Sequence, residues 1–151
     1  MPLAPTNELV VESWLAGVVG LTSSMVATTL PKDSTAWAAK GFVQVVIIGG
    51  TPDIDVPIRR PLVQLDFWAT GAGTSTKPPW NLAAGLAELV RTGVEFQQYG
   101  QLVTTREGYF NARVLSAIMR TEPRRVEGDP SGYARYSADV ELHWTRLQSQ
   151  P

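Results

Sequence analysis

The sequence predicts an α+β fold, a single domain in which a mainly antiparallel sheet packs against two helices. Alternation of apolar and polar residues marks strands over residues 61–69 and 133–145. Apolar residues at helical spacing mark helices over residues 8–19 and 80–90. A chain of 151 residues has the usual size of one domain and can bury a core. We therefore expect residues 1–151 to form one domain.

The first helix has one apolar face, which is formed by Val11, Leu15 and Val18. Thr6 and Asn7 stand just before this face, and both are residue types that cap the start of a helix. We expect one of them to be the cap and the apolar face to pack against the sheet.

Residues 42–48 are expected to form a strand in the middle of the sheet. This run, FVQVVII, is too apolar for a strand with one solvated face, so it predicts that both faces are covered. Gly49 and Gly50 follow it, which predicts a turn with positive φ at the end of the strand. A further short strand is expected over residues 25–30.

The connection over residues 49–60 should be an extended arm between two antiparallel strands. It contains Pro52 and Pro57, and Pro61 follows it. Proline has no backbone N–H to donate and fixes φ, so three prolines rule out a tight hairpin.

The second half of the chain begins with a stretch of flexible composition over residues 71–79, which is rich in Gly, Ser, Thr and Pro. We expect it to be mobile in a free subunit and ordered on assembly. After the second helix, residues 94–111 give no clear pattern. A strand over residues 114–119 should then lead through a hairpin turn over residues 123–132 into the last strand, whose apolar phase includes Leu142.

Composition argues against several classes of function. Thirteen basic and fourteen acidic residues leave a net charge of −1, so nucleic acid and anionic lipid have no general attraction for the chain. The absence of cysteine excludes disulfides, thiolate metal sites and cysteine nucleophiles. The start of the chain lacks the pattern of a signal peptide, and no apolar run approaches the ~18 residues of a membrane helix. We expect a soluble protein that is cytoplasmic when made and has no membrane contact.

Residues that could carry catalysis are few. His143 is the only histidine, so one chain cannot supply a site that needs two. Asp53, Asp55 and Asp66 could in principle bind a divalent cation, but no calcium-loop glycine and glutamate follow them. We expect no enzyme activity, cofactor or metal. A small ligand-binding or hydrolytic α+β domain that uses these four residues is the alternative from a different class.

Charged and aromatic residues are the better candidates for an interaction site. Two arginine doublets fall in expected connections, where they could contact DNA phosphate, an acidic patch on a partner or only solvent. Trp37, Trp68 and Trp80 fall outside the clearest core positions, and tryptophan is enriched in interfaces. The polar residues that alternate with the apolar ones in the last strand are further candidates. The candidate interaction residues are Arg59, Arg60, Trp80, Arg124, Arg125, Arg135, Asp139 and Glu141.

The order of these segments resembles the tail terminator, or tail-completion, proteins of long-tailed bacteriophages. Two phrases carry the resemblance, FVQVVIIGGTP over residues 42–52 and RPLVQLDFWA over residues 60–69. It extends over roughly residues 8–145, nearly the whole chain. Both phrases are structural and neither is a catalytic signature.

The resemblance implies a structural virion protein with a one-domain fold. Proteins of this family form a hexameric ring that caps the tail-tube protein, ends tube polymerisation and presents a surface to head-completion proteins. Viral DNA would pass through the ring without sequence-specific binding. The expected location is the host cytoplasm during assembly and then the head-proximal end of the tail. Another neck or tube component, such as a head-closure or tail-tube protein, is the alternative within the virion.

Overall fold

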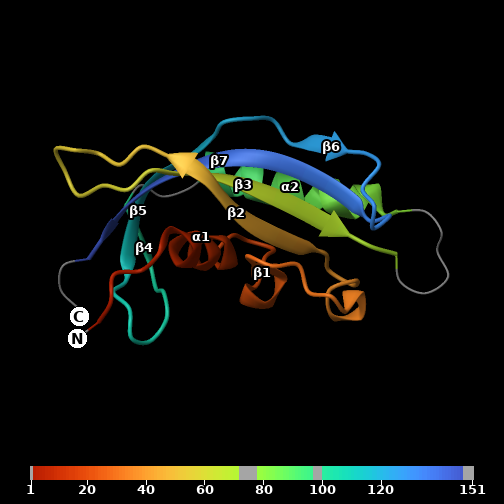
Figure 1. The fold of residues 1–151 in the computed structure, drawn as a ribbon, viewed down its shortest axis with the longest axis horizontal. Helices are drawn as coiled ribbons and strands as arrows, with labels where there is room; N and C mark the ends of the chain where they lie inside the picture. Colours follow the sequence, from red (N-terminus) through yellow and green to blue (C-terminus); the bar gives the residue numbers. More distant parts are fainter. Residues whose placement is uncertain (1, 72–77, 97–99, 148–151) are drawn as a thin grey trace.

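The computed structural model describes residues 2–71, 78–96 and 100–147, and it has one curved sheet with two helices (Figure 1). The helices are α1 (Asn7–Ala16) and α2 (Trp80–Glu95), with short 3-10 turns η1 (Ser23–Met25) and η2 (Ser34–Ala36). The strands are β1 (Val26–Ala27), β2 (Phe42–Gly50), β3 (Pro61–Ala69), β4 (Gln101–Val103), β5 (Ala112–Met119), β6 (Arg124–Val126) and β7 (Ala134–Arg146).

The sheet has the strand order β1-β2-β3-β7-β5-β4, and β6 pairs with β7 beyond the end of β5. Only the pairing of β1 with β2 is parallel among the described strands, and the other pairings are antiparallel. The predicted α+β class, with a mainly antiparallel sheet and two helices, is confirmed.

Both helices pack on one face of the sheet, which we call the inner face. The apolar phases of β2, β3 and β7 meet there in register, as in the row of Val45, Leu65 and Ala138. These residues join one buried cluster with Leu15 of α1 and Val90 of α2. The helices therefore cover the inner face, and the opposite, outer face has no helix on it.

Helix α1 begins where the sequence predicts and ends earlier. Thr6 caps it by accepting a hydrogen bond from the Leu9 backbone N–H at 3.2 Å. The helix ends at Ala16, not near Val19, and the backbone N–H of Gly17 returns to the carbonyl of Trp14. The capping prediction is confirmed, and the predicted end was three residues too late.

Helix α2 continues five residues beyond the predicted end at Val90, to Glu95. Gly93 lies inside it, where a Cβ would come within 3.1 Å of Val18. A glycine that weakens a helix locally is used here for close packing between α2 and the segment after α1. Neither this helix nor any other in the described chain is long and apolar enough to cross a membrane.

The prediction that β2 lies in mid-sheet with both faces covered is wrong. Only the two-residue β1 lies outside β2, so β2 is next to the edge. Val43 and Val45 are buried against the helices, whereas Val46 is half-buried on the outer face and Ile48 is 46% exposed. On the outer face, Phe42 is buried at the start of the strand, whereas Val46 and Ile48 towards its end are only partly covered.

Gly49 and Gly50 remain within β2 and do not end it. The register with β3 shifts between Ile47 and Gly49, so the strand contains a bulge. Gly50 has φ +119°, and a Cβ there would lie 2.3 Å from the carbonyl oxygen of Arg60. The predicted need for positive φ is confirmed, but it arises from a bulge and not from a turn.

Two tryptophans that the pattern placed outside the core are buried. Trp37 and Trp68 are 4% and 8% exposed and form a second small core with Phe42. The ring of Tyr133 meets the Trp37 ring edge-on at 5.3 Å between centroids. This cluster covers the outer face at the start of β2, so these tryptophans are structural.

The predicted turn over residues 123–132 contains a short strand, β6, which pairs with Arg135 to Ser137 of β7. The residue range that was expected to be a plain connection is therefore partly sheet. The predicted flexible loop over residues 71–79 falls mostly on residues 72–77, which lie outside the described residues.

Candidate functional site

Arg135 is held by a buried carboxylate on the outer face of the sheet. Its Nη2 lies 3.2 Å from Oδ2 of Asp66, whose residue is 3% exposed. Gln64 donates to the same carboxylate at 3.1 Å, and the guanidinium lies 5.1 Å from the centre of the Trp68 ring. Losing one partner of a buried ion pair leaves an uncompensated charge, so Arg135 is needed by the fold itself.

Glu141 is the centre of a second polar group on the outer face. Arg120 donates to both carboxylate oxygens at 3.0 Å, and Nε2 of His143 lies 2.6 Å from Oε2. The hydrogen bond from His143, followed by that from Arg120, lowers the pKa of Glu141 below its usual value. Glu141 is therefore charged at neutral pH and already paired.

Two oxygens beside these groups lack a hydrogen-bond partner in the described part of the chain. They are Oγ of Ser137 and Oδ1 of Asp139, and both are buried. A buried polar atom without a partner costs free energy, so such atoms are usually satisfied by water or by a bound partner. Both oxygens lie beneath the surface of the outer face, so neither is exposed to a protein partner.

Two predicted interaction residues, Arg125 and Trp80, contact one another. The guanidinium of Arg125 lies 3.7 Å from the centre of the Trp80 ring, and its Nε is 3.0 Å from a carboxylate oxygen of Glu127. Arg124 forms a strand pair with Ser137, and its residue is exposed. The doublet was expected in a connection but belongs to β6, and within the described residues Arg124 forms no ion pair.

Arg59 and Arg60 fasten the base of the arm between β2 and β3, residues 51–60. Arg59 exchanges two backbone hydrogen bonds with Trp144 of β7, at 2.8 and 2.9 Å. Nη2 of Arg60 lies 2.7 Å from Oδ2 of Asp53 on the opposite side of the arm. These arginines therefore act within the subunit and brace the arm against β7.

The arm ends in a structured tip, residues 53–56. Oδ1 of Asp53 accepts the backbone N–H groups of Asp55 and Val56 at 2.8 and 3.2 Å, and these hydrogen bonds lower the pKa of Asp53. Ile54 is 95% exposed and Val56 is 44% exposed. The arm thus holds two apolar side chains away from the body in a fixed turn.

Ile54 and Val56 at the arm tip were absent from the interaction candidates that the sequence offered. Their signal was available, because Ile54 and Val56 are apolar residues within a proline-rich connection. The interaction candidates were chosen for charge or for an aromatic ring, and Ile54 and Val56 have neither.

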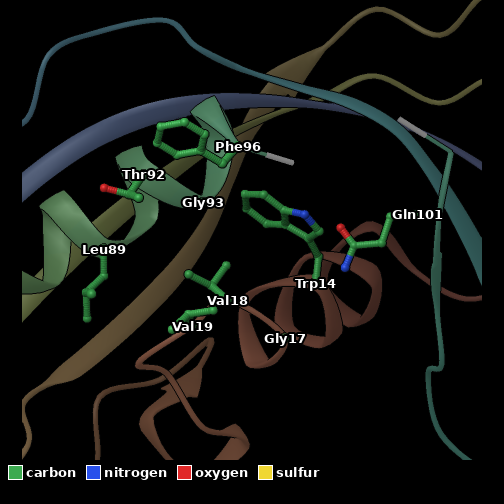
Figure 2. Close-up of a pocket in the computed structure, with 9 residues that line it drawn as sticks. All are labelled: Trp14, Gly17, Val18, Val19, Leu89, Thr92, Gly93, Phe96 and Gln101. Atoms are coloured by element: carbon green, nitrogen blue, oxygen red, sulfur yellow. The ribbon is translucent and has the colours of Figure 1, made fainter. Parts of the chain in front are cut away.

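The α1–α2 hollow lies between the end of α1 and the second half of α2 and has a volume of about 430 Å³. Figure 2 shows its lining side chains, with Trp14 and Val18 on one side and Leu89 and Phe96 on the other. The lining is mainly apolar. Phe96 and the adjoining Val19 are 79% and 89% exposed, so the hollow is an open apolar surface.

A second hollow, which we call the Lys40 hollow, lies on the other side of Leu89 and has a volume of about 470 Å³. Leu89 lines both hollows. Lys40 is exposed and forms no ion pair with any residue the structure describes. The residues that line this hollow include Gly20, Met25, Lys40, Leu82, Gly85 and Leu89.

The four residues of the alternative enzyme site belong to separate places. Asp53 and Asp55 are on the arm, whereas Asp66 pairs with Ser137 in the strand register. His143 is six residues further along β7, which is about 20 Å at 3.3 Å per residue. Within residues 2–71, 78–96 and 100–147, no group of three His, Cys, Asp or Glu side chains could hold a metal ion.

Comparison with known proteins gives no assignment. No family model matches the chain, and no curated protein matches it. Among solved structures, one of several chains that match has a TM-score of 0.38 and 16% sequence identity, over 95% of this chain and 92% of that chain.

Proposed function

We propose that this protein is a bacteriophage tail terminator. Six copies would form a ring on the last layer of tail-tube protein, end polymerisation of the tube and present a surface to the head-completion proteins. The protein would act in the host cytoplasm during assembly and then remain in the virion at the head-proximal end of the tail.

The observation that carries this proposal is the arm between β2 and β3. The two phrases that resemble tail terminators coincide with β2 and β3, and the arm connects them. Ile54 at its tip is 95% exposed on a support braced by the Arg60–Asp53 ion pair. Val56 beside it is 44% exposed, so the braced tip offers two neighbouring apolar side chains as an anchor for a protein partner.

The charge of the chain supports a ring through which DNA passes without sequence-specific binding. The net charge is −1, so the protein as a whole would not hold the DNA. Arg60 and Arg125 form ion pairs within the subunit, so part of the basic charge is already neutralised.

The proposal is tested by adding purified protein to growing tail tubes and measuring tube lengths by electron microscopy. A terminator should stop growth and appear as a ring at one end of each tube. Long polymers of this protein alone would indicate a tail-tube protein instead. Binding to heads but not to tubes would indicate a head-closure protein.

A further inference from the structure

An exposed apolar tip and an open apolar hollow lie at opposite ends of β2. The Lys40 hollow is adjacent to the start of β2 at Phe42, and the arm leaves from its end at Gly50. Figure 1 shows this separation, with the arm in yellow at one end of the sheet and the orange segment before β2 at the other. A strand of nine residues spans about 30 Å, so the tip cannot reach the hollow of its own subunit.

The tip and the Lys40 hollow are complementary in chemistry. Met25, Leu82 and Leu89 give the hollow an apolar wall that suits Ile54. The side chain of Asp55 has no partner within the described chain, and its neighbour Asp53 is neutralised by Arg60. The net charge of the tip is therefore negative, whereas the charge at the rim of the hollow comes from Lys40. The tip therefore carries an anion beside an apolar side chain, and the hollow carries a cation beside an apolar cavity.

We propose that the arm tip of one subunit inserts into the Lys40 hollow of the next copy of this chain, with Ile54 in the cavity and Asp55 paired with Lys40. This contact uses different surfaces on the two copies and is therefore head to tail. Such a contact closes into a ring when its rotation is right and otherwise continues as a filament. The contact itself follows from the two surfaces, and its closure at six subunits rests on the proposed function.

Variants of the two surfaces test the contact without disturbing the subunit. Ile54→Asp changes a side chain that is 95% exposed, and Gly85→Gln fills the hollow from a position where a Cβ meets nothing within 4 Å. Each should weaken self-association at least tenfold, as measured by sedimentation over a concentration series. Val19→Asp is the matched control, because Val19 is 89% exposed and lies outside the Lys40 hollow, and it should associate like wild type.

Mixing the two variants tests whether the contact is head to tail. Ile54→Asp subunits keep a working hollow, and Gly85→Gln subunits keep a working arm. An equimolar mixture should therefore give dimers that grow no further. A charge exchange tests the ion pair in the same way: Asp55→Lys and Lys40→Asp should each weaken association, and the double variant should recover it.

Cysteine cross-linking detects the contact even if it is weak, because the chain has no cysteine of its own. Under oxidation, the variant with Ile54→Cys and Gly85→Cys should form disulfide-linked multimers, whereas Ile54→Cys with Glu107→Cys should not. A ladder that ends at six supports both the contact and the terminator function. A ladder without limit supports the contact and contradicts that function. If the variant with Ile54→Cys and Gly85→Cys caps tubes normally but forms no cross-linked multimers, the contact is overturned and the terminator function is not. The contact is also overturned if the Ile54→Asp variant associates like wild type.

Discussion

At the scale of single residues, strand β7 places its apolar side chains on the inner face of the sheet and its charged side chains on the outer face. Leu142 and Trp144 are each 1% exposed on the inner face, and the Trp144 Nε1–H donates to Oδ1 of Asn7 at 3.0 Å. Glu141 lies on the outer face and is paired with Arg120 and His143. The alternation of this strand thus determines which changes unfold the subunit and which alter its surface.

Leu142→Ala should lower the free energy of unfolding by about 2 to 5 kcal/mol, because it removes buried apolar atoms and leaves a cavity. Val19→Ala, at a side chain that is 89% exposed, should change it by less than about 0.5 kcal/mol. Urea unfolding followed by tryptophan fluorescence measures both. Equal stabilities would show that the inner phase of β7 is not in the core.

Two glutamates should give opposite dependences of stability on pH. The pKa of Glu141 is lowered by His143 and Arg120, so its contribution to stability is present above the pKa of the unfolded chain and is lost as pH falls through the folded pKa. The pKa of Glu12 is raised by burial, so its protonated form favours the fold and this contribution is lost as pH rises.

Glu141→Gln should therefore destabilise the protein at about pH 7, and this effect should shrink as pH falls through the folded pKa of Glu141. Glu12→Gln should stabilise the protein at about pH 7. Urea unfolding of both variants over a descending pH series measures this. An effect of Glu141→Gln that does not change with pH would contradict the pairing of that carboxylate in the folded protein.

At the scale of elements, two glycines should respond to alanine in opposite directions. Gly50 has φ +119° at the bulge, and a Cβ there would collide with the Arg60 carbonyl oxygen. Gly50→Ala should therefore lower the free energy of unfolding by about 1 to 3 kcal/mol. Gly85 is exposed within α2, where a Cβ meets nothing within 4 Å, so Gly85→Ala should add about 0.5 to 1 kcal/mol. Thermal unfolding measures both, and a stabilising Gly50→Ala would show that the bulge is absent.

The sequence could predict the elements that are long enough to repeat helical spacing or strand alternation. Helix α1 and strands β3 and β7 are long enough for helical spacing or alternation to show. Strands β4 and β6 have three residues each, which is too short for a pattern, and their pairing depends on long-range contacts with β5 and β7. The apolar run of β2 predicted two covered faces, but apolar residues alone do not show whether a face is covered, and Ile48 is 46% exposed.

The candidate site was predicted less well than the fold. Charge selected Arg59, Arg60 and Arg135. The structure pairs the guanidinium groups of Arg60 and Arg135 with carboxylates of the same subunit, and the Arg59 backbone is hydrogen-bonded to Trp144. The side chain that stands free is Ile54, whose exposure depends on how the arm folds back on Asp53. A sequence shows which residues are apolar, but only the fold shows which of them are exposed to solvent.

At the scale of the whole molecule, the subunit is asymmetric in two directions. The helices cover only the inner face of the sheet, and the arm and the Lys40 hollow lie at opposite ends of β2. A body with different surfaces at its two ends is suited to cyclic assembly, in which each subunit contacts the next in the same way.

Assembly should depend on concentration and on the tube, because self-association follows mass action and a tube end that binds subunits brings them together. We expect monomers in dilute solution and hexamers at high concentration or at a tube end. The state of the protein is measured by native mass spectrometry over a concentration series, first alone and then with tail tubes.

Electron microscopy of tail tubes grown with and without this protein tests the terminator function, with the copy number per tube end taken from native mass spectrometry. We expect tubes to stop growing and to carry a closed ring of six subunits at one end. Tubes that grow to the same lengths in the presence of the protein, with no ring at either end, would contradict this function.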